Sequence, residues 1–189
     1  GSEINSSTFG KGDGGAIKIT ASDRISVDGK GANGFPSGIF SAVNDEGVGN
    51  SGGIEIATND LTLTNGGAIS SSTFGRGNAG EIKITASDTI SANGINGSSG
   101  IFSSVADTGI GDAGGIELTT NNLTLKQGGA IIASTFGKGN AGQIKVNTLD
   151  TISTDGEGED GFSSGIFSSV NEKAEGDAGG IEIATGNLT

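Results

Sequence analysis

The chain has 189 residues, of which 38 are Gly and one is Pro, and it contains no Cys, His, Met, Trp or Tyr. Its 22 acidic and 10 basic residues give a formal net charge of −12, which argues against a nucleic-acid-binding protein and against adsorption to anionic lipid. The lack of Cys excludes a disulfide scaffold and a thiolate metal site. No transmembrane helix and no signal peptide are predicted, because there is no long apolar run and residues 1–5 lack a basic and apolar start.

A glycine-rich turn that leads into an alternating strand recurs six times, with the pattern Gly-x-Gly-Asx-x-Gly-x-Ile-x-aliphatic. The copies begin at Gly10, Gly47, Gly75, Gly109, Gly137 and Ala174, the last of which departs from the pattern. Successive copies start 37, 28, 34, 28 and 37 residues apart, so short and long units alternate within a larger repeat of 62 to 65 residues. Periods of this size are typical of a solenoid in which each unit stacks on the one before.

Three short segments with period-two alternation are expected in each unit. In the first long unit they are residues 16–20, 25–27 and 37–43, and in the first short unit they are residues 54–56, 61–63 and 68–74. Residues 1–9 match residues 66–74, so the chain opens inside a repeat, and it stops in the second strand of a further short unit. Long units gain their extra residues at two corners, before the third strand (31–37) and after it (44–49), and such insertions project from one face.

Three strands per turn with glycine corners predict an all-β fold, a parallel three-sided β-helix with Ile-x-Ile and Leu-x-Leu pairs turned inward. We expect a right-handed coil, by the rule for parallel crossovers. Residues 1–189 are expected to form a single array of about five full coils with partial coils at both ends, as a fragment of a longer chain. Helix is not expected, because each interior Gly costs a helix roughly 1 kcal/mol.

One column of the repeat predicts how the coils stack. Between the two aliphatic positions the copies read Lys18, Glu55, Lys83, Glu117, Lys145 and Glu182. In parallel register every outward charge would lie between two opposite charges, so a ladder of ion pairs is predicted that favours the correct register. The Asx column places no two aspartates side by side, with Asp13, Asn50, Asn78, Asp112, Asn140 and Asp177.

The Gly-x-Gly-x-x-Gly sequences at 47–52, 75–80, 109–114 and 137–142 imitate a dinucleotide fingerprint. That fingerprint needs a helix after it. Here a strand follows, so corner turns with positive φ are the favoured interpretation.

Acidic clusters at Asn44–Glu46, Glu157–Asp160 and Glu172–Glu175 could supply oxygen ligands for Ca²⁺, but solvated corner loops are favoured over a calcium site. No catalytic, cofactor-binding or metal-binding residue is assigned. Without His or Tyr, the carboxylates and the serines of Ser70–Ser72 lack the usual proton-transfer partners, so the chain is not expected to be an enzyme.

Phenylalanines recur at one position in the long units and at another in the short units. The long-unit set is Phe40, Phe102 and Phe167, and the short-unit set is Phe9, Phe74 and Phe136. A structural aromatic stack along one edge is favoured over a ligand platform.

Residues 52–70 (GGIEIATNDLTLTNGGAIS) and 80–91 (GEIKITASDTIS) resemble the repeat region of filamentous-haemagglutinin-like exoproteins, most of all the large two-partner-secretion proteins of cyanobacteria. The resemblance covers essentially the whole chain. It implies an adhesin-like shaft on a right-handed β-helix that is secreted or held at the outer cell surface. The secretion domain of that family, with its Asn-Pro-Asn motifs, has no counterpart in these residues.

The leading functional expectation is therefore a structural and adhesive shaft segment of a large bacterial exoprotein. Its expected partners are neighbouring repeats or end-to-end copies in a filament, with cell-surface glycans or other cells as further candidates, and neither nucleic acid nor membrane insertion is expected. The alternative is a polysaccharide-degrading or polysaccharide-binding β-helix protein. An ice-binding solenoid is disfavoured, because the second strand alternates Thr62 with Ser26 and Ser91 instead of presenting Thr on every coil.

Overall fold

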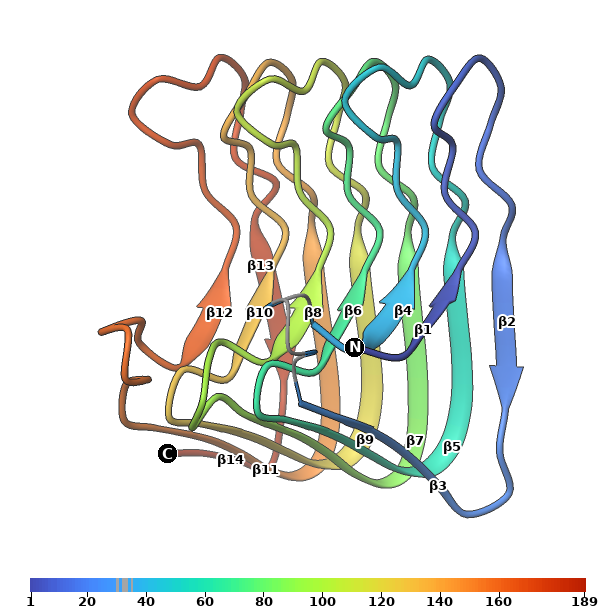
Figure 1. Ribbon diagram of the computed structural model, residues 1–189. Coiled ribbons are helices and arrows are strands. Elements are labelled where there is room, and N and C mark those ends of the chain that lie inside the picture. Colours follow the sequence, from blue (N-terminus) through green and yellow to red (C-terminus); the bar gives the residue numbers. More distant parts are fainter. Residues whose placement is uncertain (30, 32–33, 35) are drawn as a thin grey trace.

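The computed structural model describes residues 1–29, 31, 34 and 36–189. In that part of the chain the regular structure is entirely β-strand, wound into a parallel β-solenoid of about six turns (Figure 1). The predicted all-β parallel β-helix is thereby confirmed. None of the described residues forms a helix long and apolar enough to cross a membrane.

Two parallel sheets run along the solenoid, and each turn of the chain extends both of them. The first has the order β1-β4-β6-β8-β10-β12, and the second follows the path β13-β11-β9-β7-β5-β2, with β3 paired to β5 and β14 paired to β11. The strands of the first sheet are β1 Glu3–Asn5, β4 Gly38–Phe40, β6 Ala68–Ser70, β8 Gly100–Phe102, β10 Ala130–Ile132 and β12 Gly165–Phe167. Those of the second are β2 Ile17–Thr20, β3 Arg24–Asp28, β5 Ile54–Thr64, β7 Ile82–Asn93, β9 Ile116–Lys126, β11 Ile144–Asp155, β13 Ile181–Ala184 and β14 Asn187–Leu188.

The expected break between the first and second strands of each coil is absent in the inner coils, which corrects the sequence-based boundaries. β5, β7, β9 and β11 each run through both segments as one bent strand of 11 or 12 residues. No Gly or Pro lies between Ala57 and Asp60 or at the equivalent bends, so pairing continues around the corner with only a shift of register. Long coils carry one extra residue at this bend, because Thr58 pairs with Ala86 whereas Asp60, two residues later, pairs with Thr89, three residues after Ala86. The sequence-based prediction missed this third difference in length between short and long coils.

The interior is a set of aliphatic columns contributed by both sheets. Ile54, Ile82, Ile116 and Ile144 lie in register and are at most 1 % exposed. Parallel columns come from the second half of the long strands and from the middle residue of each strand in the first sheet, such as Ile101. Full burial of each such side chain is worth about 1.5–3 kcal/mol. Each coil therefore buries an equivalent set of aliphatic side chains, and these sets stack along the axis to form the core.

The loops of the long coils leave the solenoid at the junction between the two sheets. Short coils cross this corner in a two-residue turn with positive φ at both residues, Asn65–Gly66 and Gln127–Gly128. Long coils insert extra residues here, such as those between Asp155 and Gly165. A second set of insertions follows the third strand, where it forms the turns drawn at the top of Figure 1. The larger insertions thus lie at the two corners that were expected to carry them, in addition to the single extra residue at the bend.

The third strand of each coil is shorter than predicted, because regular pairing ends after three residues. Beyond it, isolated bridges and further hydrogen bonds connect the coils. One column of bridges alternates threonine and valine, and its members are Thr8, Val43, Thr73, Val105, Thr135 and Val170. A second column lies within the glycine corner, between its first and second positions, and its members are Lys11, Val48, Arg76, Ile110, Lys138 and Glu175.

Candidate functional site

The charged column lies in register as predicted, from Lys18 in β2 to Glu182 in β13. Among the described residues, however, direct ion pairs form at the first and third of the five steps of this column, with Lys18 Nζ 2.9 Å from Glu55 Oε1 and Lys83 Nζ 3.0 Å from Glu117 Oε2. The hydrogen bond with Glu117 and the negative charge of that residue raise the pKa of Lys83. The charges of Glu81 and Glu55 raise this pKa further, by smaller amounts. The continuous ladder is therefore wrong in detail: within the column the charges form separate rungs, all of them solvated.

The Asx column has a role that its charge pattern did not indicate. From Asp13 to Asn140, each side-chain oxygen accepts a hydrogen bond from the backbone N–H of the Asx residue in the next coil, at 2.7–2.9 Å. Asp and Asn serve this purpose equally well, because both carry the accepting oxygen. The column therefore connects neighbouring coils in one direction along the axis.

The Gly-x-Gly-x-x-Gly corners are structural. Positive φ, which favours Gly, occurs at the second glycine of each corner, for example Gly49 at 143° and Gly111 at 146°. The last glycine is required for a different reason, since a Cβ on Gly80 would lie 2.6 Å from the carbonyl carbon of Gly52. The neighbouring coil fills the space that a phosphate would need, and a strand follows each corner, so these sequences do not form a dinucleotide site.

The acidic clusters lie in loops, and several of their carboxylates have protein partners. Asp160 accepts hydrogen bonds from Ser98 Oγ at 2.9 Å and from the N–H of Phe162 at 3.0 Å. Glu175 Oε2 lies 3.3 Å from Lys138 Nζ. Among the described residues, no group of three or more acidic side chains is placed to hold a metal ion.

The predicted stack of aromatic side chains is wrong. Phe40, Phe102 and Phe167 do share one register column of the first sheet, but Ser70 and Ile132 separate them. In the described part of the chain, the ring contact is that of Phe162 with Phe167, edge to face at 5.5 Å between centroids. Ring-to-ring stacking therefore does not explain why a phenylalanine recurs in every long coil.

These phenylalanines instead lie over glycines. The residue two positions earlier on the same face of the sheet is Gly38, Gly100 or Gly165. A Cβ on Gly100 would lie 3.0 Å from Cζ of Phe102, and one on Gly165 would lie 2.9 Å from Cζ of Phe167. The rings thus lie along the sheet instead of standing away from it, and each fills the space above a glycine.

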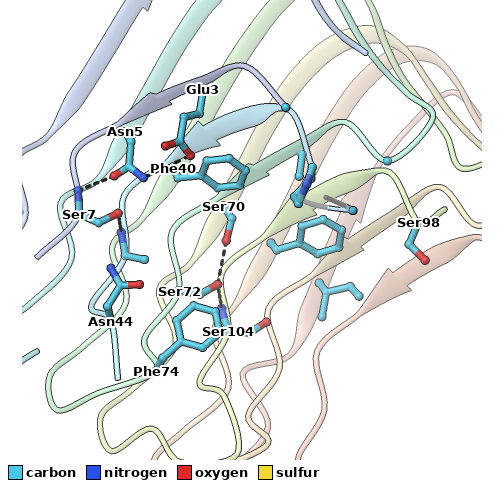
Figure 2. Close-up of a pocket in the computed structure, with 18 of the residues that line it drawn as sticks. Glu3, Asn5, Ser7, Phe40, Asn44, Ser70, Ser72, Phe74, Ser98 and Ser104 are labelled. Carbon is cyan, nitrogen blue, oxygen red and sulfur yellow. Dashed lines mark hydrogen bonds between the residues drawn. The ribbon is translucent and has the colours of Figure 1, made fainter. Parts of the chain in front are cut away.

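A groove with a volume of about 990 Å³ runs across the outer face of the first sheet and includes Phe40 and Phe102 (Figure 2). It crosses β1, β4, β6, β8 and β10, which are successive strands of that sheet. At the strand spacing of 4.7–4.9 Å, its length is roughly 19 Å. Phe9, Phe74 and Phe136 contribute to it and are 69 %, 41 % and 39 % exposed.

Hydroxyl groups follow the strands across the groove. Ser70 Oγ and Ser72 Oγ are 3.0 Å apart, and Ser72 Oγ accepts a hydrogen bond of 3.2 Å from the backbone N–H of Ser104 (Figure 2). Ser7 accepts in the same way from Ala42 N–H at 2.9 Å. The Ser104 hydroxyl lines the groove and forms no hydrogen bond with another described residue.

The serines of Ser70–Ser72 thus divide by the alternation of the strand. Ser71 turns inward, where it is fully buried and donates to the carbonyl of Gly52 at 3.1 Å, while Ser70 and Ser72 line the groove. Sequence reasoning considered these serines only as nucleophiles. The signal for a groove was present in the repeated Gly-x-Phe of the long coils at 38–40, 100–102 and 165–167.

Among the described residues that line the groove, the charged side chains are both acidic, Glu3 from β1 and Asp160 from the loop before β12. Glu3 is within 3.5 Å of the amide of Asn5. The groove therefore combines aromatic rings, hydroxyls and amides with a weakly negative edge.

Comparison with protein families, with curated proteins and with solved structures finds no match for this chain.

Proposed function

We propose that this chain is a structural and adhesive shaft segment of a large secreted or cell-surface bacterial exoprotein of the filamentous-haemagglutinin-like type. The observation that supports this most is the continuity of stacking. The same column of residues pairs from coil to coil between Ile17 and Ile181, and in the described strands the register shifts at the bend and then continues on its other side.

Such an array extends in one dimension. Each coil adds one strand spacing of about 4.7–4.9 Å to the length and contacts only its neighbours. Backbone hydrogen bonds, the Asx column and the aliphatic columns all connect consecutive coils. This geometry is best suited to a rigid spacer that presents corner loops at regular intervals.

The proposal is tested by locating the segment on cells and measuring its shape. Antibodies raised against the folded chain should label intact, unpermeabilised source cells along surface fibres in immunoelectron microscopy. Labelling that requires permeabilisation would overturn the proposal.

The shape is measured on engineered chains that carry one, two or three extra copies of residues 54–115. The length of the particle in X-ray scattering should increase by about 9.4–9.8 Å per copy.

A second copy of the chain is the partner proposed for the ends of the array. Stacked end to end, Glu182 of one copy would lie beside Lys18 of the next, which continues the alternation of the charged column. Light scattering should then show association that increases with protein concentration. A strictly monomeric species at high concentration and low salt would contradict end-to-end stacking.

The alternative of a polysaccharide-degrading enzyme has less support from the groove. A pair of catalytic carboxylates must lie about 5–9.5 Å apart. Asp160 is bound to Ser98, directly before β8, while Glu3 lies on β1, three strand positions away. That separation is roughly 14 Å by strand spacing. A screen of neutral and acidic polysaccharides for release of reducing ends tests the alternative, which would gain support if one carboxylate substitution abolished turnover.

A further inference from the structure

We propose that the groove on the outer face of the first sheet binds a neutral, extended, β-linked polysaccharide along the solenoid axis. This goes beyond the shaft function, and it depends on the groove alone, so it stands or falls independently of where the protein is located. The occupant follows from four properties of the lining: its backbone pairing, its charge, its aromatic spacing and its hydroxyls.

Backbone pairing argues against a peptide strand as the occupant. Every strand that the groove crosses is an element of the first sheet, and the interior members, β4, β6, β8 and β10, pair on both sides. Addition of a peptide strand requires a free sheet edge, and the groove lies on a sheet face. The ligand must therefore bind through side chains.

Charge argues against anionic polymers. Among the described residues, the charged side chains of the lining are Glu3 and Asp160, with no Lys or Arg, in a chain of net charge −12. Nucleic acids and sulfated or uronic glycans need cationic groups to offset their charge. A neutral ligand carries no such cost, and its binding is insensitive to salt.

The spacing of the rings matches a polymer that repeats every two sugars. Phe40 and Phe102 are two strands apart in the sheet, which is about 9.4–9.8 Å. This is close to the length of a disaccharide in an extended β-linked chain, in which alternate sugars turn the same face to one side. The π-face of a phenylalanine carries negative charge density, and the axial C–H groups of a pyranose complement it.

The hydroxyl row supplies the polar contacts that such a chain needs. Ser70 lies between the two rings, Ser72 follows it on the same coil, and Ser104 lies beside Ser72 on the next coil with its hydroxyl unused within the described residues. Serine hydroxyls both donate and accept, as sugar hydroxyls do. Shared donor and acceptor character allows the row to bind a glycan in several registers.

The test uses the whole chain and a panel of soluble polysaccharides in affinity electrophoresis and titration calorimetry. The panel contains a β-1,4-glucan derivative, a β-mannan, an α-glucan, polygalacturonate, heparin and a proline-rich polypeptide. We expect binding to one or more of the neutral β-linked polymers, unchanged between low and high salt. Binding confined to the anionic polymers or to the polypeptide, or no binding to any member, would overturn the proposal.

Two substitutions locate the site, with a matched control. Phe40→Ser and Phe102→Ser each introduce the residue that occupies the same column at Ser70, so the solenoid accommodates it. Each should weaken binding about threefold to tenfold, as expected for one aromatic contact, and the double variant should bind more weakly still. Phe167→Ser is the control, because Phe167 shares the column but lies outside the groove. Unchanged binding by the double variant, with an unaltered melting temperature, would overturn the assignment.

Discussion

The second glycine of each corner offers a test of how tightly the coils approach. Gly111 has φ of +146°, and a Cβ there would lie 2.5 Å from the carbonyl carbon of Gly77 in the preceding coil. Gly12 occupies the same place in the repeat with φ of +138°, but nothing lies within 4 Å of its Cβ position. The two glycines share backbone strain and differ in steric contact.

Alanine at Gly12 should therefore cost only the strain of a left-handed backbone, about 1–3 kcal/mol. Alanine at Gly111 should cost the same strain plus the displacement of one coil from the next, about 1–3 kcal/mol more. The free energy of unfolding, measured by urea denaturation with far-UV circular dichroism, should thus fall by about 2–6 kcal/mol for Gly111→Ala. Gly161→Ala is a second control, because Gly161 has φ of +77° and open space in a loop of a later coil.

Equal losses for Gly111→Ala and Gly12→Ala would refute the reasoning. That result would mean that the corner glycines are needed for backbone conformation alone and that the coils tolerate wider spacing at this edge. A loss at Gly161 as large as that at Gly111 would lead to the same conclusion.

Three further changes test other features of the coil. Glu117→Lys should lower the free energy of unfolding, and high salt should reduce this loss. If the rungs are separate, the charge swap that combines Lys83→Glu with Glu117→Lys should restore most of the loss. Failure of the double variant to recover in urea titrations would favour a continuous ladder. Thr73→Val should raise the free energy of unfolding by about 1 kcal/mol, because the buried Thr73 hydroxyl has no hydrogen-bond partner among the described residues. A decrease of similar size in the free energy of unfolding would show that this hydroxyl forms a hydrogen bond. Hydrogen bonds from Thr64 and Asn65 lower the pKa of Asp28, so its contribution to stability is present above the ordinary pKa and is lost as pH falls through the depressed one. Asp28→Asn should flatten that acid limb in thermal melts taken at several pH values, and an unchanged limb would contradict this role.

The stacking register was predictable because it depends on properties that a linear sequence displays. Alternation with period two identifies the inward residues, and opposite charges at Lys18 and Glu55 identify neighbouring coils. Glycine corners were predictable for the same reason, since Gly marks positions where the backbone or its neighbour leaves no room for a side chain.

The continuous bend and the groove were not predictable to the same degree. The bend between Ala57 and Asp60 has polar residues that resemble a turn, yet pairing with the coils on both sides holds it in strand conformation. The groove depends on which side of a three-residue strand faces outward and on how the ring of Phe102 lies over Gly100, and both are set by packing. The alternation of Phe with Ser and Ile along that column was visible in the sequence, but its meaning required the register.

The alternation of short and long coils also constrains how a gene for such a protein can grow or shrink. Duplication or loss of one coil would bring two like charges together in the column that contains Glu55 and Lys83, and it would disturb the two-strand interval between Phe40 and Phe102. Duplication or loss of a pair of coils, 62 to 65 residues, preserves both patterns. Recombination between adjacent repeats is therefore neutral to the fold only in steps of two coils, and variants of this shaft should differ in length by multiples of about 9.4–9.8 Å.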